Sequence, residues 1–395
     1  MDSSHWYRRA AATRRRSSRW RRLVVTAVAP LLALAVTAPA QAQGVWLTLP
    51  SMPTPRAFAA TAAADCPVGV AGTCVYSVGG RTEAGGEGVN TAEAYSPALN
   101  AWLTLPALPT ARLNAGGATA PCPEGVPDSC VYVVGGFGGG ATLDTVEAYS
   151  PATNTWLDVP SMPTARNAPG ATAAPCPEAV DGLEGTCVYA IGGIGGGVSL
   201  ATVEAYSPAT NTWATLPDLP GSGVGIGAAT APCPVVLTSP GTCVYAVGGQ
   251  GQAIVRAYNP TVNAWLDIPD LPTARQAAAT AAPCPDGVEN GCVYALDGFS
   301  FSDPADAAAA TEAYSPVANT WATLPDLPTP RTGVGAATAP CPKAANSTCV
   351  YAVGGGIDPD GTVEAFAVER HAPGRDHDDD HGHDHRDDRR GGDRG

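Results

Sequence analysis

The chain has 395 residues and a formal net charge of −14, and only 15% of its residues are charged. Its 46 glycines and 38 prolines favour many short strands joined by tight turns over long helices. Lys343 is the only lysine, and no basic patch with interleaved aromatic side chains can be drawn. We therefore expect no nucleic-acid partner, because phosphates would be repelled by the acidic chain.

The N-terminus has the order of a secretory signal peptide. Eight arginines up to Arg22 precede an apolar run from Leu23 to Ala38, and small residues follow through Ala42. This order predicts a signal peptide over residues 1–42. A membrane anchor is the alternative, but the apolar run of 16 residues is shorter than the roughly 20 residues of a spanning helix. We therefore expect a secreted or extracytoplasmic protein with no membrane span after cleavage.

Cleavage would also change the charge of the protein. Loss of eight arginines and Asp2 takes the net charge from −14 to −21. A charge of this size favours a soluble protein.

The rest of the chain consists of copies of one sequence repeat, which is clearest from Cys130 to Arg166. An apolar run ends in two glycines, an alternating run ends in Tyr-Ser-Pro, and a Trp-containing run leads to Pro-Thr-Ala-Arg. The phrase occurs six times, the last copy being truncated, and each copy predicts short strands separated by turns. No single copy can bury both faces of so small a sheet, so the copies must stack.

The double glycine, the Tyr and the Trp at fixed offsets resemble the kelch repeat. The resemblance implies an all-β, six-bladed β-propeller with four-stranded blades over residues 43–370. The Trp-containing strands recur at Trp46, Trp102, Trp156, Trp213, Trp265 and Trp321.

The two ends of the repeat region are complementary. The run Gly44–Pro50 is a Trp-containing strand with nothing before it, whereas the last repeat, Thr332–Val368, has no Trp-containing strand. We expect the N-terminal strand to complete the C-terminal blade and close the ring, which would remove two unpaired strand edges.

Twelve cysteines occur as one pair per repeat, each bracketing the loop between an alanine-rich strand and a Cys-Val-Tyr strand. An even count in an exported chain favours six local disulfides, with zinc thiolates as the alternative. The pairs are Cys66 and Cys74, Cys122 and Cys130, Cys176 and Cys187, Cys233 and Cys243, Cys284 and Cys292, and Cys341 and Cys349.

Five arginines end the Pro-Thr-x-Arg turns and form a predicted ring at the channel mouth. Resemblance to ligand-binding kelch propellers implies an anion or carboxylate site there. Alternatively, each arginine pairs with a repeat glutamate. The arginines are Arg56, Arg112, Arg166, Arg275 and Arg331, and the glutamates are Glu93, Glu147, Glu204, Glu312 and Glu364.

Two repeats depart from the pattern, through drift or because they form a site. The fourth lacks the Pro-Thr-x-Arg turn and carries Arg256 in place of the repeat glutamate. The fifth reads Leu296-Asp297-Gly298 in place of the usual Val-Gly-Gly, and an insertion over residues 300–310 follows. Asp297 is therefore the first residue to examine as an acid or base.

Beyond Arg370 the composition changes to Asp, His, Arg and Gly, which predicts a disordered tail over residues 371–395. Its imidazoles could bind Zn²⁺, Ni²⁺ or Cu²⁺ weakly, or the tail could only add solubility. No other cofactor is expected. The candidate metal ligands are His377, His381, His383 and His385.

The sequence shows no evident catalytic machinery. The six histidines lie outside the predicted propeller, which argues against Ser-His-Asp chemistry and against the copper site of propellers related to galactose oxidase. We predict a secreted, monomeric binding protein that takes an extracellular protein or glycan on its loop face. The alternative is a carbohydrate-active propeller enzyme of the mutarotase or lyase type.

Overall fold

The computed structural model describes residues 44–221, 223–235, 241–285, 291–299, 309–356, 358–359 and 361–368. The predicted signal peptide, the histidine-containing tail and most of the fifth-repeat insertion lie outside these residues. In the part of the chain that is described, no helix has the length and apolarity that a membrane crossing requires.

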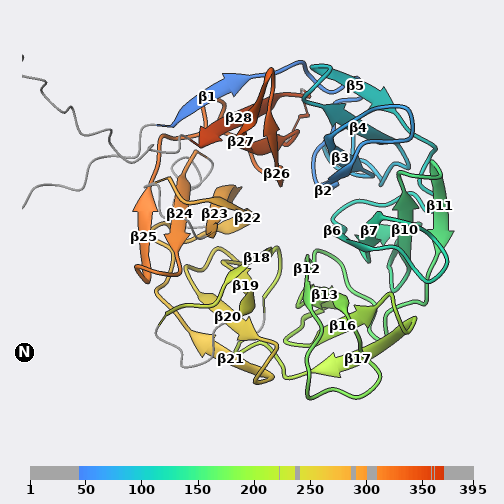
Figure 1. Cartoon of the computed structure of the whole chain (residues 1–395), viewed down its shortest axis with the longest axis vertical. Helices are drawn as coiled ribbons and strands as arrows, with labels where there is room; N and C mark the ends of the chain where they lie inside the picture. Colours follow the sequence, from blue (N-terminus) through green and yellow to red (C-terminus); the bar gives the residue numbers. More distant parts are fainter. Residues whose placement is uncertain are drawn as a thin grey trace, which may run out of the picture. The chain divides into compact units, whose positions relative to one another are not determined.

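Six four-stranded antiparallel sheets form a closed ring, as Figure 1 shows. This confirms the expected six-bladed propeller. Blades 1 to 3 run from the inner to the outer strand as β2 (Ala60–Asp65), β3 (Thr73–Val78), β4 (Ala92–Ser96) and β5 (Ala101–Thr104); β6 (Gly116–Pro121), β7 (Ser129–Val134), β10 (Val146–Ser150) and β11 (Thr155–Asp158); and β12 (Gly170–Pro175), β13 (Thr186–Ile191), β16 (Val203–Ser207) and β17 (Thr212–Leu216).

The other three blades follow the same inner-to-outer order. They are β18 (Gly227–Pro232), β19 (Thr242–Val247), β20 (Val255–Asn259) and β21 (Ala264–Asp267); β22 (Gln276–Pro283), β23 (Gly291–Phe299), β24 (Thr311–Ser315) and β25 (Thr320–Thr323); and β26 (Gly335–Cys341), β27 (Ala344–Val353), β28 (Val363–Val368) and β1 (Val45–Thr48). Short hairpins β8 (Phe137–Gly138) with β9 (Ala141–Thr142), and β14 (Ile194–Gly195) with β15 (Val198–Ser199), extend two loops.

The N-terminal strand closes the ring as predicted. β1 pairs antiparallel with β28, so that Trp46 lies opposite Phe366. The indole N–H of Trp46 donates to the carbonyl of Pro325 in blade 5, and the indole of Trp102 donates to Pro50. Trp156, Trp213, Trp265 and Trp321 make the same bond to the preceding blade. Each tryptophan therefore links its outer strand to the outer strand before it.

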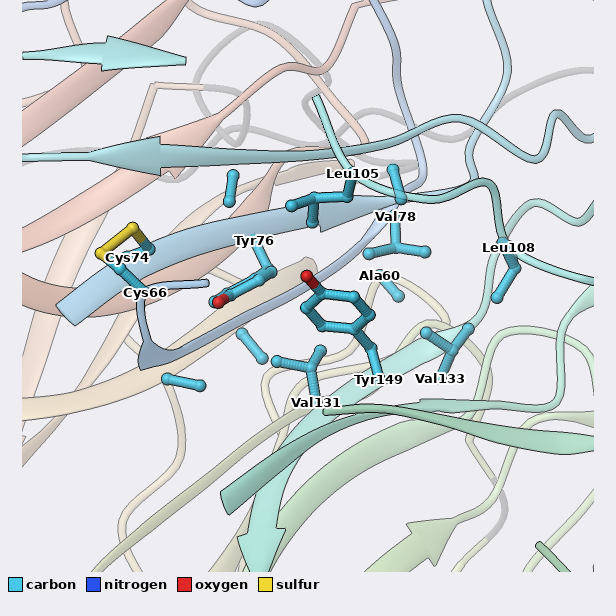
Figure 2. Packing of buried hydrophobic residues seen from close by; sticks show 14 residues of the cluster. Ala60, Cys66, Cys74, Tyr76, Val78, Leu105, Leu108, Val131, Val133 and Tyr149 are labelled. Carbon is cyan, nitrogen blue, oxygen red and sulfur yellow. A yellow bond between two sulfur atoms is a disulfide. The ribbon is translucent and has the colours of Figure 1, made fainter. Parts of the chain in front are cut away.

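Aromatic side chains fill the space between blades. Tyr76 of blade 1 packs on Tyr149 of blade 2 with ring centroids 5.8 Å apart, beside Val131 and Val133 (Figure 2). Tyr132 and Tyr206 repeat the contact between blades 2 and 3. The inner strands carry Ala, Gly and Thr because they converge at the axis, where larger side chains would collide. A Cβ added to Gly117, for example, would lie 2.5 Å from the Thr61 carbonyl oxygen.

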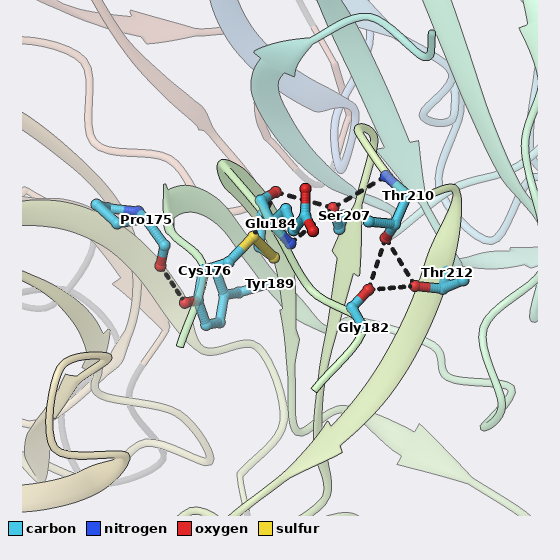
Figure 3. The surroundings of a disulfide bond; sticks show 9 residues. Pro175, Cys176, Gly182, Glu184, Tyr189, Ser207, Thr210 and Thr212 are labelled. Carbon is cyan, nitrogen blue, oxygen red and sulfur yellow. Dashed lines mark hydrogen bonds between the residues drawn. A yellow bond between two sulfur atoms is a disulfide. The ribbon is translucent and has the colours of Figure 1, made fainter. Parts of the chain in front are cut away.

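All six predicted disulfides are present, which confirms the local pairing, and the described residues hold no free cysteine. Each closes the loop between the inner and second strands of a blade. The Cys176–Cys187 loop, the longest, is also tied to the outer hairpin. The hydroxyl of Ser207 donates to the Glu184 carbonyl, and the hydroxyl of Thr212 donates to the Gly182 carbonyl (Figure 3).

Candidate functional site

The five turn arginines are buried and paired, and do not face a ligand. Each donates to the repeat glutamate of its own blade at 2.5–2.6 Å. Four arginines have no exposed surface and Arg331 is 6% exposed. The pairs are Arg56 with Glu93, Arg112 with Glu147, Arg166 with Glu204, Arg275 with Glu312, and Arg331 with Glu364. The expected ring of ligand-binding arginines is therefore wrong, and the alternative of structural pairs is correct.

Arg112 shows what these side chains do. Its guanidinium donates to the carbonyls of Thr110, Gly135 and Thr145, to the Thr145 hydroxyl and to the Glu147 carboxylate. Burial lowers the pKa of Arg112 and raises the pKa of Glu147, and the charge of each partner opposes the shift in the other. The arginine thus joins the entry turn of the blade to its double-glycine turn, using donors that are all committed within the fold.

Blade 4 is the exception that supports this role. It has neither the turn arginine nor the repeat glutamate, since Arg256 replaces the latter. Arg256 instead reaches Asp267 on the outer strand at 2.9 Å. A buried charge left without its partner is costly. If the pair is structural, a blade that lacks the arginine should therefore also lack the glutamate, as blade 4 does.

A cavity of about 470 Å³ lies on the axis and is lined mainly by the entry turns and the first residues of the inner strands. We call it the mouth cavity. Its polar and aromatic lining includes Phe58, Arg81, Asn114, Gln276 and Asp297, and its remaining wall is largely alanine and glycine. It shares inner-strand residues with a smaller space of about 250 Å³ lined by Ala, Gly and Thr. Its volume lies within the range of about 300–1,000 Å³ typical of small-molecule sites.

Strained backbone surrounds this cavity. Phe58, Asn114 and Ala168 have φ values of +58°, +53° and +53°, a conformation that a bulky residue such as phenylalanine rarely adopts. A series of backbone hydrogen bonds between neighbouring blades holds this conformation in place. The Phe58 N–H donates to the Gly333 carbonyl, the Asn114 N–H to the Phe58 carbonyl and the Ala168 N–H to the Asn114 carbonyl. Such strain costs about 1–3 kcal/mol per residue and tends to gather at ligand sites.

Arg81, which also lines the cavity, differs from its equivalents in the other repeats. Arg81 follows the double glycine of blade 1, where blades 2 and 3 have Phe137 and Ile194. Its guanidinium carbon lies 4.7 Å from the centre of the Phe58 ring, a cation–π contact. The Arg81 Nε atom is buried and has no hydrogen-bond partner in the described part of the chain.

Asp297 occupies a glycine position. Its φ of +57° matches the first glycine of the double-glycine turn in the other blades, where φ is +59° to +68°. The side chain is 1% exposed, and its Oδ2 accepts a hydrogen bond from the Val334 N–H of blade 6. Burial raises the pKa of Asp297 to about 7, against the opposing effect of backbone N–H groups and of Arg331 and Arg275. The Asp297 Oδ1 atom has no hydrogen-bond partner among the described residues.

Three residues that line the mouth cavity each have one buried polar atom without a hydrogen-bond partner among the described residues: Thr61 Oγ1, Arg81 Nε and Asp297 Oδ1. Each such group costs about 1–3 kcal/mol, and native proteins keep few of them.

The sequence alone singled out Asp297 but missed Arg81 and Phe58. Their signal was the same: each departs from its repeat equivalents. No group of three or more metal-ligating side chains occurs among the described residues. The predicted ligands His377, His381, His383 and His385 lie outside those residues.

Comparison with known proteins places similar motifs in blades 1 to 3. The family profile described as Kelch motif matches residues 62–109, 125–163 and 185–220. Kelch-like protein 23 of Homo sapiens is 27% identical over 199 residues, which cover 50% of this chain and 31% of that protein. Kelch-like protein 36 of Mus musculus is 25% identical over 306 residues, covering 74% and 43%. Kelch-like protein terF of Aspergillus terreus is 26% identical over 196 residues, covering 45% and 38%. The chain spans less than half the length of each of these relatives.

Proposed function

Because the chain is a kelch-repeat β-propeller, we propose that it is an exported binding module that holds its ligand in the mouth cavity. One observation carries this proposal. The residues that depart from the repeat at Phe58, Arg81 and Asp297 line one cavity. The arginines and tyrosines that recur in the repeats make structural contacts. Selectivity for a ligand must therefore come from the residues that differ between repeats.

Export is part of the proposal. The N-terminal 42 residues have the order of a signal peptide, and six disulfides suit an oxidising compartment. Mass spectrometry of the protein from the producing cells tests this. We expect a mature N-terminus at Gln43 in the extracellular or periplasmic fraction. An intact N-terminus on a cytosolic protein with reduced cysteines would contradict export.

Binding at the mouth is tested with two mouth variants and one matched control. Arg81→Ala and Asp297→Gly should lose at least tenfold in affinity for any ligand found with glycan and peptide arrays. Arg256→Ala removes an arginine of blade 4 that pairs with Asp267 and does not line the cavity, so it should bind as the parent does. Equal binding by all three variants would show that the ligand lies elsewhere.

Catalysis is a second candidate, favoured by the burial of Asp297 in a cavity and its pKa of about 7. A carboxyl with such a pKa can accept and return a proton at neutral pH. The enzyme would be a sugar mutarotase or lyase. Exchange of sugar anomers followed by NMR is the test: acceleration that Asp297→Asn abolishes would establish it, and no acceleration would leave binding alone.

A further inference from the structure

Resting on the export proposed above, we infer that Asn346 is the acceptor for an N-linked glycan. Asn346, Ser347 and Thr348 form the triplet Asn-x-Ser/Thr, which is a glycan acceptor in exported proteins when x is not proline. It is the only triplet of this kind in the sequence. One other Asn-x-Thr triplet begins at Asn259, but its central residue is Pro260. The sequence therefore offers a single acceptor.

The structure separates these two asparagines by burial. Asn346 and Ser347 are exposed, and Thr348 is half-buried. Asn259, in contrast, is 1% exposed and lies in β20, the third strand of blade 4. A glycan is bulky and hydrated, so its asparagine must reach solvent in the folded protein. The triplet of blade 6 meets this condition.

The backbone of the triplet bulges out of the sheet. Cys341 of β26 pairs with Ala344 of β27, and the next pair is Pro340 with Thr348. The residues between Ala344 and Thr348 therefore have no strand partner on β26. On the opposite edge, the pairing of β27 with β28 begins only at Thr348. Asn346 is thus free of the sheet on both edges, and a glycan attached there would break no strand pairing.

The triplet lies at the end of blade 6 that is remote from the mouth cavity. β26 begins at Gly335, which lines that cavity, and ends at Cys341. The strand has 7 residues, so at about 3.3 Å per residue its two ends are about 20 Å apart. The Cys341–Cys349 disulfide fixes the hairpin that carries Asn346. A glycan there would cover the face of the propeller that carries the disulfide loops and would leave the mouth open.

The modification is a glycosyl transfer. The side-chain nitrogen of Asn346 forms a bond to the anomeric carbon of a lipid-linked oligosaccharide. The bond between that carbon and the lipid phosphate breaks, the phosphate keeps the electron pair, and one amide proton is released. The hydroxyl of Thr348 is the third-position group that defines the acceptor. The transfer takes place as the chain crosses the exporting membrane, so it depends on the predicted signal peptide.

The test is mass spectrometry of peptides from the mature, disulfide-bonded protein recovered outside its producing cells. We expect the peptide that contains Asn346 to carry a glycan, located on this residue by fragmentation. Asn346→Gln, Thr348→Val and Ser347→Pro, made in the same cells, should each lose the glycan completely.

Ser347→Ala is the matched control for these variants. It changes the central residue of the triplet but keeps an acceptor, so it should be glycosylated to the same extent as the parent. Thermal unfolding checks that each variant folds. Loss of the glycan in Ser347→Ala as well would contradict recognition of the triplet.

The remaining outcomes separate the glycan from export. An unmodified Asn346 in a mature, disulfide-bonded, exported protein would overturn the glycan and leave export standing. A glycan that persists in Asn346→Gln would place the acceptor on another residue and would also overturn it. A cytosolic protein with an intact N-terminus and reduced cysteines would refute export, and the glycan with it.

Discussion

Replacing Arg112 by methionine is expected to destabilise the propeller strongly, because Glu147 would remain buried without its partner. The arginine has no exposed surface and Glu147 is 5% exposed, and their N–O distance is 2.5 Å. Breaking a buried pair by removing one partner costs about 3–5 kcal/mol. The carbonyl oxygens of Gly135 and Thr145 would also lose the donors that Arg112 supplies.

A second variant separates the pair from the single charge. Arg112→Met combined with Glu147→Leu removes both charges, as blade 4 does naturally, and should recover a substantial part of the loss. The assay is urea unfolding of the disulfide-bonded protein, followed by tryptophan fluorescence and by far-ultraviolet circular dichroism. Coincident transitions support a two-state analysis.

The result that would refute the reasoning is specific. Neutral surface substitutions typically change the free energy of unfolding by no more than about 0.5 kcal/mol. If the free energy of unfolding of Arg112→Met differs from that of the parent by no more than this, then the guanidinium is not a structural partner. Ligand binding by the arginine ring would then have to be considered again. A double variant no more stable than the single one would show that the stranded carboxylate is not the source of the loss.

Three further predictions concern Asp297, one disulfide and one tryptophan. Because its folded pKa of about 7 lies above the ordinary value of 3.8, Asp297 favours the folded state at low pH, and that contribution is lost as pH rises from about 4 to 7. The protein should be about 2–3 kcal/mol less stable at pH 8 than at pH 5, relative to Asp297→Asn; parallel pH profiles of the two proteins in urea unfolding would contradict the shift. Replacing both Cys122 and Cys130 by alanine opens a short loop and should cost about 2.5 kcal/mol in the same assay, so an unchanged urea midpoint would argue that the hairpin is already ordered in the unfolded chain. Trp102→Ala removes the contact with Tyr95 and the bond to Pro50, and a loss of about 3 kcal/mol should appear in thermal unfolding monitored by circular dichroism, whereas a barely shifted melting curve would mean that adjacent blades are not joined through this side chain.

Much of the fold could be predicted from the sequence because the features that specify it are local and recur in every repeat. Trp46 without a preceding repeat and a last repeat without a tryptophan predicted the shared blade, since an open ring would leave unpaired edges. Each cysteine pair brackets one hairpin loop, so its pairing depended only on the path of that hairpin. The signal peptide, the tail and its metal ligands stay predictions.

The site was harder to predict because its residues come from different blades. Arg112 and Glu147 are 35 residues apart, and both belong to a repeated phrase that gives no direction for either side chain. The absence of both residues from blade 4 could have indicated that they form a pair. That inference, however, requires knowing that the entry turn and the third strand of one blade face each other.

By itself, therefore, the sequence determined the number of blades, the closure of the ring and the disulfide pairs, because these follow from the spacing of residues along the chain. Only the tertiary structure decided that the arginines are buried, and that Phe58, Arg81 and Asp297 share a cavity. Ring closure brings blade 1 beside blade 6, where the Phe58 N–H donates to the Gly333 carbonyl. Asp297 of blade 5 accepts a hydrogen bond from the Val334 N–H of blade 6. The physical reason is that burial and unmet hydrogen bonds depend on neighbours supplied by separate blades, which no single repeat contains.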